Sequence, residues 1–143
     1  MRGILTFTSS CEEVSEYDHP KGYFICKFLA DNLPQYGFVV TPQENYRDIA
    51  WSVDCEVNTN KIFFFVGYLG TETADWQLII CSNKGFISRK LGFSDEKERT
   101  ELALAIHKIL SNDSRFSEMR WYCRYSGTLK DKWFAEPVDS VTV

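Results

Sequence analysis

Hydrophobic and polar residues alternate most regularly between positions 48 and 57. One side of the alternation carries Ile49, Trp51, Val53, Cys55 and Val57, and the other carries Asp48, Ala50, Ser52, Asp54 and Glu56. A period of two over this length predicts a half-buried β-strand with one face in solvent.

Neighbouring apolar runs predict the rest of a sheet. Lys61–Leu69 is apolar on both faces, which favours a central strand, and Asp75–Ser82 forms the next strand. Turns are expected at residues 58–60, where Asn tolerates positive φ, and at residues 70–74. Further strands are expected over Gly3–Thr8, Gly37–Val40 and Met119–Tyr125, with a short extra piece over Gly85–Arg89, whereas residues 41–47 are interpreted as a loop.

Two segments show helical spacing of apolar residues. The first helix is expected over Lys21–Leu33, with Asp18 as its cap, Pro20 in its first turn, and Pro34 and Gly37 at its end. The second begins at Ser94 or Asp95 and ends near Asn112. Asp95 and Glu98 have the spacing of a capping box.

This order of elements predicts one α+β domain over residues 1–143. We expect a mostly antiparallel sheet of five to six strands, in the order β-α-β-β-β-β-(β)-α-β, with both helices packed on one face. Residues 127–143 are less periodic, so this tail is expected to wrap the body through Trp133 and Phe134 or to fray.

Composition and charge narrow the possible partners. The 143 residues carry a net charge of −4, which argues against nucleic acid and against an anionic membrane surface as partners. No apolar run is long enough to cross a membrane or to act as a signal peptide, so a cytoplasmic location is expected. The high aromatic content, 15%, favours a Phe-rich core over an aromatic recognition surface.

Cysteine and histidine offer little chemistry in this sequence. The five cysteines are Cys11, Cys26, Cys55, Cys81 and Cys123. They show no C-x-x-C spacing and are expected to be reduced thiols, with neither a metal site nor a cofactor. A Cys–His nucleophile using His19 or His107 is disfavoured because no nearby sequence supplies an electropositive, accessible site.

Two charged strand faces remain as candidate sites. Asp48, Asp54 and Glu56 share the polar face of the alternating strand, and Asp75 is a candidate to join them from a neighbouring strand. Such carboxylates can hold Mg²⁺ or Ca²⁺, work as an acid–base pair, or simply form a solvated face.

The last predicted strand carries the opposite charge. Arg120 and Arg124 flank Tyr122 on one face, a pairing typical of binding sites, although these arginines could instead pair with the acidic strand across the sheet. Trp133 in the tail is either an exposed contact residue or a tether to the body.

The missing signatures favour a binding role over an enzymatic one. There is no P-loop, no dinucleotide-binding glycine motif, no nucleophile elbow and no H-E-x-x-H motif. The general character resembles the small immunity proteins of bacterial toxin systems and many uncharacterised bacterial single-domain proteins. No motif carries this resemblance, so it transfers no functional residue.

We therefore expect a non-enzymatic module that binds, and in the immunity-protein case inhibits, another protein. The contact residues would be those of the two charged faces, with Trp133. Two alternatives stay open: a small metal-dependent hydrolase that uses the clustered carboxylates, and a small-ligand binder with an aromatic pocket between helices and sheet. The sequence leaves the oligomeric state open.

Overall fold

The computed structural model describes residues 2–11, 20–71, 74–82, 94–123 and 132–139. These residues form a seven-stranded antiparallel sheet, two α-helices and one 3-10 helix. In chain order the elements are β1 (Ile4–Ser9), α1 (Tyr23–Asn32), η2 (Leu33–Tyr36, the 3-10 helix), β2 (Val39–Val40), β3 (Glu44–Tyr46), β4 (Ala50–Val57), β5 (Asn60–Tyr68), β6 (Trp76–Ser82), α3 (Glu96–Ser111) and β7 (Phe116–Tyr122).

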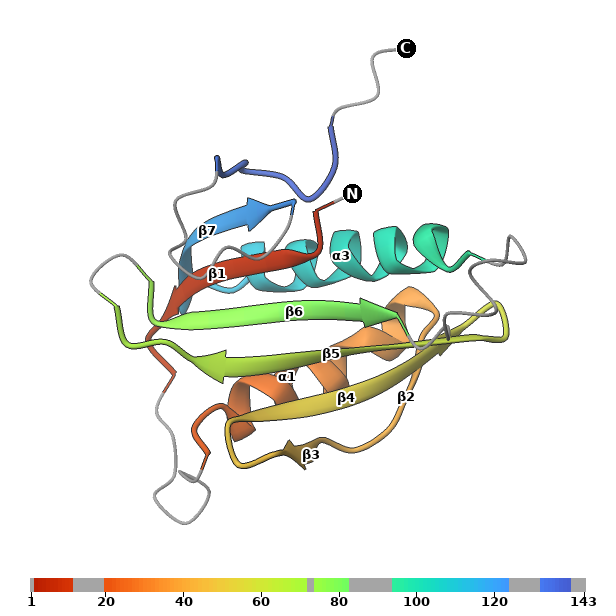
Figure 1. The fold of residues 1–143 in the computed structure, drawn as a ribbon, viewed down its shortest axis with the longest axis horizontal. Helices are drawn as coiled ribbons and strands as arrows, with labels where there is room; N and C mark the ends of the chain where they lie inside the picture. Colours follow the sequence, from red (N-terminus) through yellow and green to blue (C-terminus); the bar gives the residue numbers. More distant parts are fainter. Residues whose placement is uncertain (1, 12–19, 72–73, 83–93, 124–131, 140–143) are drawn as a thin grey trace.

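The sheet has the strand order β2-β4-β5-β6-β1-β7, and β3 also pairs with β4. Strands β4, β5 and β6 form a meander, while β1 lies between β6 and β7. Both α-helices lie behind this sheet, on one face (Figure 1). The predicted α+β class and the placement of both helices are confirmed. The short strand β3, which falls in the predicted loop, raises the number of strands.

Alternation along the central strands decides which side chains fill the core. The inward side chains of β5 and its neighbours have exposures of 0%, including Val53, Ile62, Phe64, Val66 and Leu78. They pack against equally buried side chains of α1 and α3, among them Leu29 and Ile106. The period of two therefore builds one apolar layer between sheet and helices, and leaves the other face of β4 to polar side chains.

The first helix begins later than its sequence signals predicted. Gly22, with φ of 115°, is the residue before α1, so Pro20 lies ahead of the helix and not in its first turn. A Cβ at Gly22 would lie 3.2 Å from the Trp76 ring, so both the backbone conformation and the close packing favour glycine there. Leu33 and Pro34 continue into η2, which Gly37 ends with φ of 90°.

The second helix forms as predicted, but the capping box does not. Asp95 occupies the cap position, yet its carboxylate accepts hydrogen bonds from Arg99 Nε at 2.8 Å and from the Ser82 hydroxyl. Glu98 Oε1 accepts from Asn60 Nδ2 at 2.8 Å. The Ser94 hydroxyl accepts the Glu96 N–H at 3.2 Å instead. Tertiary contacts with β5 and β6 therefore outweigh the local capping pattern.

Strand β4 begins at Ala50, two residues after the predicted start at Asp48. Arg47 and Asp48 have φ of 53° and 58°, so they form a tight turn between β3 and β4. This turn reverses the expected burial at the start of the strand, because Ile49 is 65% exposed whereas Ala50 is 2% exposed. The strand thus carries only part of the predicted alternation.

The last strand lies three residues earlier than predicted, at Phe116–Tyr122 and not Met119–Tyr125. Glu118 has φ of 56°, and the pairing of β1 with β7 shifts register between Thr6 and Thr8. This irregularity is a β-bulge, which inserts a residue into the alternation. A strict period of two could not locate it.

Neither edge of the sheet presents a long free strand in the described residues. The β2/β3 edge consists of two very short strands, Val39–Val40 and Glu44–Tyr46. At the β7 edge, Trp121 and Phe134 exchange two backbone hydrogen bonds of 2.8 and 2.9 Å. Short or covered edges limit strand pairing with other chains.

Some predictions fall on residues that the structure does not describe. These are the cap at Asp18, His19, the extra strand Gly85–Arg89, Arg124, and the parts of the tail at residues 126–131 and 140–143. Within the described residues, no helix has the length and apolar character needed to cross a membrane.

Candidate functional site

Asp54 and Glu56 lie on the sheet face that points away from the helices. They alternate with the buried residues Val53 and Cys55 on β4, as the sequence predicted for these two carboxylates. Glu56 pairs with Val39 of β2. Thr41 extends the pairing, because its N–H donates to Asp54 O at 3.0 Å and its hydroxyl accepts the Asp54 N–H at 3.1 Å.

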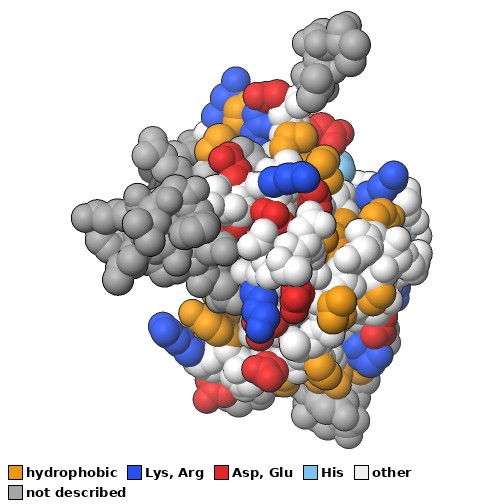
Figure 2. All heavy atoms as spheres, turned by 90° about the vertical axis from the view of Figure 1, so that its right-hand side faces the viewer, with side chains coloured by type: hydrophobic (Ala, Val, Ile, Leu, Met, Phe, Trp, Pro, Cys, Tyr) orange, Lys and Arg blue, Asp and Glu red, His pale blue; other side chains and the backbone are white. Residues whose placement is uncertain are grey.

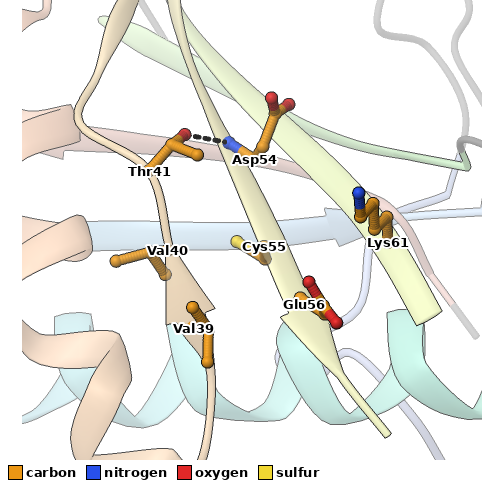
Figure 3. A pocket seen from close by; sticks show the side chains of 7 residues that line it. All are labelled: Val39, Val40, Thr41, Asp54, Cys55, Glu56 and Lys61. Carbon is orange, nitrogen blue, oxygen red and sulfur yellow. Dashed lines mark hydrogen bonds between the residues drawn. The ribbon is translucent and has the colours of Figure 1, made fainter. Parts of the chain in front are cut away.

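A hollow of about 190 Å³ lies beside these two carboxylates, and we call it the acidic hollow. Figure 3 shows its side chains: Asp54, Cys55 and Glu56 come from β4, Lys61 from β5, Val39 and Val40 from β2, and Thr41 from the residues after β2. Its wall is partly apolar, and Val39 at its rim is 71% exposed.

Two carboxylates, those of Asp54 and Glu56, and one ammonium group, that of Lys61, line the acidic hollow. Lys61 is the cross-strand partner of Glu56, and Glu44 of β3 pairs with Ser52 on the same outer face, next to Asp54. Within the described residues, neither Asp54 nor Glu56 forms an ion pair. Both carboxylates are therefore available to a cationic group from outside.

The other predicted members of this acidic cluster lie elsewhere. Asp48 is in the β3–β4 turn, where its carboxylate accepts a hydrogen bond from Asn45 Nδ2 at 3.0 Å, so the expectation that it shares a face with Asp54 is wrong. Asp75 also lies far from Asp54. Asp54 pairs with Phe63 of β5, which pairs with Cys81 near the end of β6, whereas Asp75 lies just before the start of β6. Among the described residues, no three His, Cys, Asp or Glu side chains gather to hold a metal ion.

Surface charge is mixed at the end of the molecule next to the acidic hollow. Figure 2 shows the end that carries the β4–β5 turn and the start of α3. Acidic, basic and hydrophobic side chains alternate over this surface. The field of the acidic hollow is therefore local, and its reach is set by the Debye length of about 8 Å at physiological salt.

Of the arginine face predicted on the last strand, Arg120 and Tyr122 lie within the described residues. Tyr122 is only 5% exposed. Arg120 lies 3.8 Å from the Glu118 carboxylate and 5.0 Å from the ring centroid of Trp133. β7 and β4 lie toward opposite edges of the sheet, so Arg120 pairs with its own strand and not with the acidic one.

Trp133 lies in residues 132–139, which join the two ends of the described chain and which we call the clasp. Its own side chain is 49% exposed. Next to it, Phe134 lies under the guanidinium of Arg2 at 3.4 Å. Arg2 also donates to Asp139 at 2.6 Å, which lowers the pKa of that carboxyl, and its N–H donates to Pro137 O at 2.9 Å. Residues 132–139 are thus tied to β1 and β7.

His107 connects this clasp to α3. Its Nδ1 accepts a hydrogen bond from the buried Trp121 Nε1 at 3.0 Å, so the proton of the neutral ring is on Nε2, 3.1 Å from Glu136 Oε2. No local sequence pattern indicates these contacts, because the three residues lie on separate segments. The ring nitrogens of His107 are engaged by Trp121 and Glu136, which leaves no support for its use as the base of a Cys–His pair.

The cysteines are free thiols in the structure. Burial raises the pKa of Cys55 from 9.0 to about 12 and raises that of Cys26 further. Burial also raises the pKa of the half-buried Cys81 thiol. A raised pKa keeps these thiols protonated near neutral pH, which makes them poor nucleophiles.

An aromatic ligand pocket between helices and sheet gains no support from the packing. The inner layer contains fully buried apolar side chains from both helices and from the central strands, such as Ile25, Phe64 and Leu102. A hollow beside α1, lined in part by Phe24 and Phe28, is bordered by Lys27, Asp31 and Arg115 and opens at the surface.

The fold and the acidic hollow define an antiparallel α+β domain with a charged outer sheet face. The chain matches no protein-family model, and no curated protein or solved structure shows significant similarity to it. Its function must therefore be argued from its own residues.

Proposed function

We propose that this domain is a non-enzymatic module that binds a basic surface of another protein at the acidic hollow. The observation that carries the proposal is the pair of carboxylates, Asp54 and Glu56, on an outer sheet face without an ion-pair partner in the described residues. Complementary charge steers association and excludes wrong partners.

The shape of the acidic hollow fits the side chain of a lysine or arginine. Val39 and Val40 offer apolar surface to the methylene groups of such a side chain, while Asp54 and Glu56, with Lys61 next to Glu56, form the charged part of the lining. Lys and Arg commonly bury their stems along apolar surface and keep the charged head near acids or water. A partner whose basic surface carries one such lysine or arginine can contact both the apolar and the charged side chains of the hollow.

Capture of a partner by the full-length protein tests the proposal. The wild type, Glu56→Lys and Glu101→Lys are used as bait in native lysate at low salt, followed by mass spectrometry. Glu101 lies on α3, away from the acidic hollow, and its substitution changes the net charge by the same amount as Glu56→Lys. We expect the wild type and Glu101→Lys to retain one stoichiometric protein, and Glu56→Lys to lose it.

Loss of the partner with both substitutions would indicate a general charge effect and reject the acidic hollow as the site. Retention of the partner by Glu56→Lys would also reject it. An inhibitory role, which the resemblance to immunity proteins implies, requires a second experimental result. The purified domain must then lower the activity of the captured partner at equimolar ratio.

A further inference from the structure

The turn between β3 and β4 holds two non-glycine residues in a left-handed conformation. Arg47 and Asp48 both have positive φ, and the Ile49 N–H closes the turn by donating to Tyr46 O at 3.1 Å. Turns of this kind favour Gly and Asn, because other residues are strained in them. Strain that the surrounding structure maintains is concentrated at functional sites.

Asn45 maintains this strained turn. Its side-chain oxygen accepts the Asp48 N–H at 2.9 Å, and its Nδ2 donates to the Asp48 carboxylate at 3.0 Å. The only carboxylate of the turn thus has Asn45 as a partner, and Arg47, Asp48 and Ile49 are all exposed.

An exposed apolar side chain and two exposed cations lie at this end of the sheet. Ile49 is 65% exposed and lies next to Tyr68, which is 48% exposed, because Ala50 pairs with Gly67. Lys21 Nζ lies 4.5 Å from the centroid of the Tyr68 ring, and the Arg47 guanidinium lies 5.2 Å from the ring of Tyr46. We call Lys21, Tyr46, Arg47, Ile49 and Tyr68 the hairpin tip.

The two tyrosines of the hairpin tip pack against aromatic rings of the sheet. Tyr46 stacks on Phe65 with a centroid distance of 5.1 Å, and Tyr68 contacts the ring of Trp76 at 5.2 Å. A preorganised surface loses little conformational entropy when it binds. Tyr and Arg are also the residue types that most often carry binding energy in interfaces.

We propose that the hairpin tip is a second docking surface, for a protein partner with an apolar pocket edged by carboxylates. Ile49 would enter the pocket, and Lys21 and Arg47 would face the acidic edge. The charge of the tip favours this chemistry, since its two exposed cations, Lys21 and Arg47, outnumber the one exposed carboxylate of the turn, that of Asp48. The acidic hollow lies roughly 13–20 Å further along β4, so this inference does not rest on it.

Site-specific cross-linking in native lysate tests the inference with the full-length chain. A photoreactive phenylalanine analogue replaces Ile49 in one protein and Leu104 in a matched control, because Leu104 is 42% exposed on α3. We expect one protein to be cross-linked from position 49 and not from position 104, at a segment that contains apolar residues and Asp or Glu.

The affinity of that protein for purified variants completes the test. We expect Ile49→Asp to weaken binding at least about tenfold and Arg47→Glu by roughly three- to tenfold, with Leu104→Asp equal to wild type. Both tip residues are exposed, so the melting temperatures should stay unchanged. Equal cross-linking from both positions, a cationic contact segment, a cross-linked dimer of this chain, or wild-type affinity of both tip variants would each overturn the inference.

Failure of the hairpin tip is distinguishable from failure of the acidic hollow. Glu56→Lys and Ile49→Asp change separate surfaces, so a partner can depend on either substitution alone. Sensitivity of the cross-linked protein to Ile49→Asp without sensitivity to Glu56→Lys would support the tip, whereas the acidic hollow is rejected only by retention of its own captured partner in Glu56→Lys.

Discussion

His107 satisfies the indole N–H of a fully buried tryptophan. Trp121 is 0% exposed, and its Nε1 donates to His107 Nδ1 at 3.0 Å. A buried donor that loses its acceptor pays the cost of its desolvation. The contact from His107 to Glu136 is different, because the Glu136 side chain is 61% exposed and water can replace the histidine.

This difference predicts unequal effects of two substitutions on stability. His107→Ala should lower the free energy of unfolding by about 1–3 kcal/mol, since it leaves the Trp121 N–H unpaired. Glu136→Gln should lower it by less than about 1 kcal/mol, because the glutamine can still accept from His107 Nε2 and water reaches the exposed side chain. Urea unfolding of both variants measures this, and equal losses would contradict the assigned hydrogen bond.

Buried thiols make stability depend on pH in the alkaline range. The pKa of Cys55 rises from 9.0 to about 12 on folding, so above pH 9 the unfolded chain loses a proton that the folded chain keeps. Unfolding is therefore favoured as pH rises from 9 to 12, by about 1.4 kcal/mol per pH unit for this group.

Cys55→Ala tests the contribution of this thiol. Between pH 9 and 10.5 the stability of the variant should fall less steeply than that of the wild type, although the variant is less stable at pH 7 because it leaves a small cavity. Chemical denaturation at several pH values measures both slopes. Parallel curves for the two proteins above pH 9 would show that Cys55 does not titrate as described.

Most elements of the fold could be predicted from the sequence, because they depend on periodicity within one segment. β4, β5, β6 and α3 each have a long apolar pattern, and all four form within two residues of their predicted ends. The misplaced elements depend on single residues at positive φ. Glu118 shifts β7 by inserting a bulge, and the turn at Arg47 and Asp48 creates β3 and exposes Ile49.

The candidate site was predictable only in part, for the same reason. Asp54 and Glu56 share a face because they lie within one regular strand, and strand geometry requires this. Asp48 was misplaced because a turn interrupts the alternation before Ala50, whereas Tyr122 shares a face with Arg120 as predicted but is only 5% exposed. The contacts of His107 with Trp121 and Glu136 join three separate elements, which no local pattern describes.

The β4–β5 turn provides a test of backbone strain at the scale of one element. Asn58 and Thr59 have φ of 51° and 63°, and the predicted turn at these residues is confirmed. Asn tolerates this conformation, whereas the β-branched Thr59 is strained in it. Thr59→Gly should therefore raise the free energy of unfolding by about 1 kcal/mol.

Gly37 offers the reverse substitution as a control. Its φ is 90°, and a Cβ there would meet no atom within 4 Å, so Gly37→Ala adds backbone strain without a clash. We expect this variant to lose about 1 kcal/mol or more in urea unfolding. A loss of stability in Thr59→Gly would mean that the hydrogen bond from the Thr59 hydroxyl to Asn58 O outweighs the strain.

The two faces of the sheet differ in polarity across the described residues. The inner face of the sheet is filled by the two helices, and the β7 edge is covered by residues 132–139, while the outer face near β2 and β4 carries unpaired carboxylates. Evenly mixed charge at the adjacent end of the molecule confines the acidic field to this region. Binding at the acidic hollow should therefore depend on individual residues more than on the net charge of −4.

The rate of association with the captured partner tests this account most directly. Stopped-flow measurements compare the wild type, Glu56→Lys and Glu101→Lys at 20 mM and 300 mM salt. We predict that Glu56→Lys associates about ten times more slowly at low salt and that the difference shrinks at high salt, with Glu101→Lys close to wild type. Equal rates for Glu56→Lys and Glu101→Lys at low salt would contradict binding at the acidic hollow.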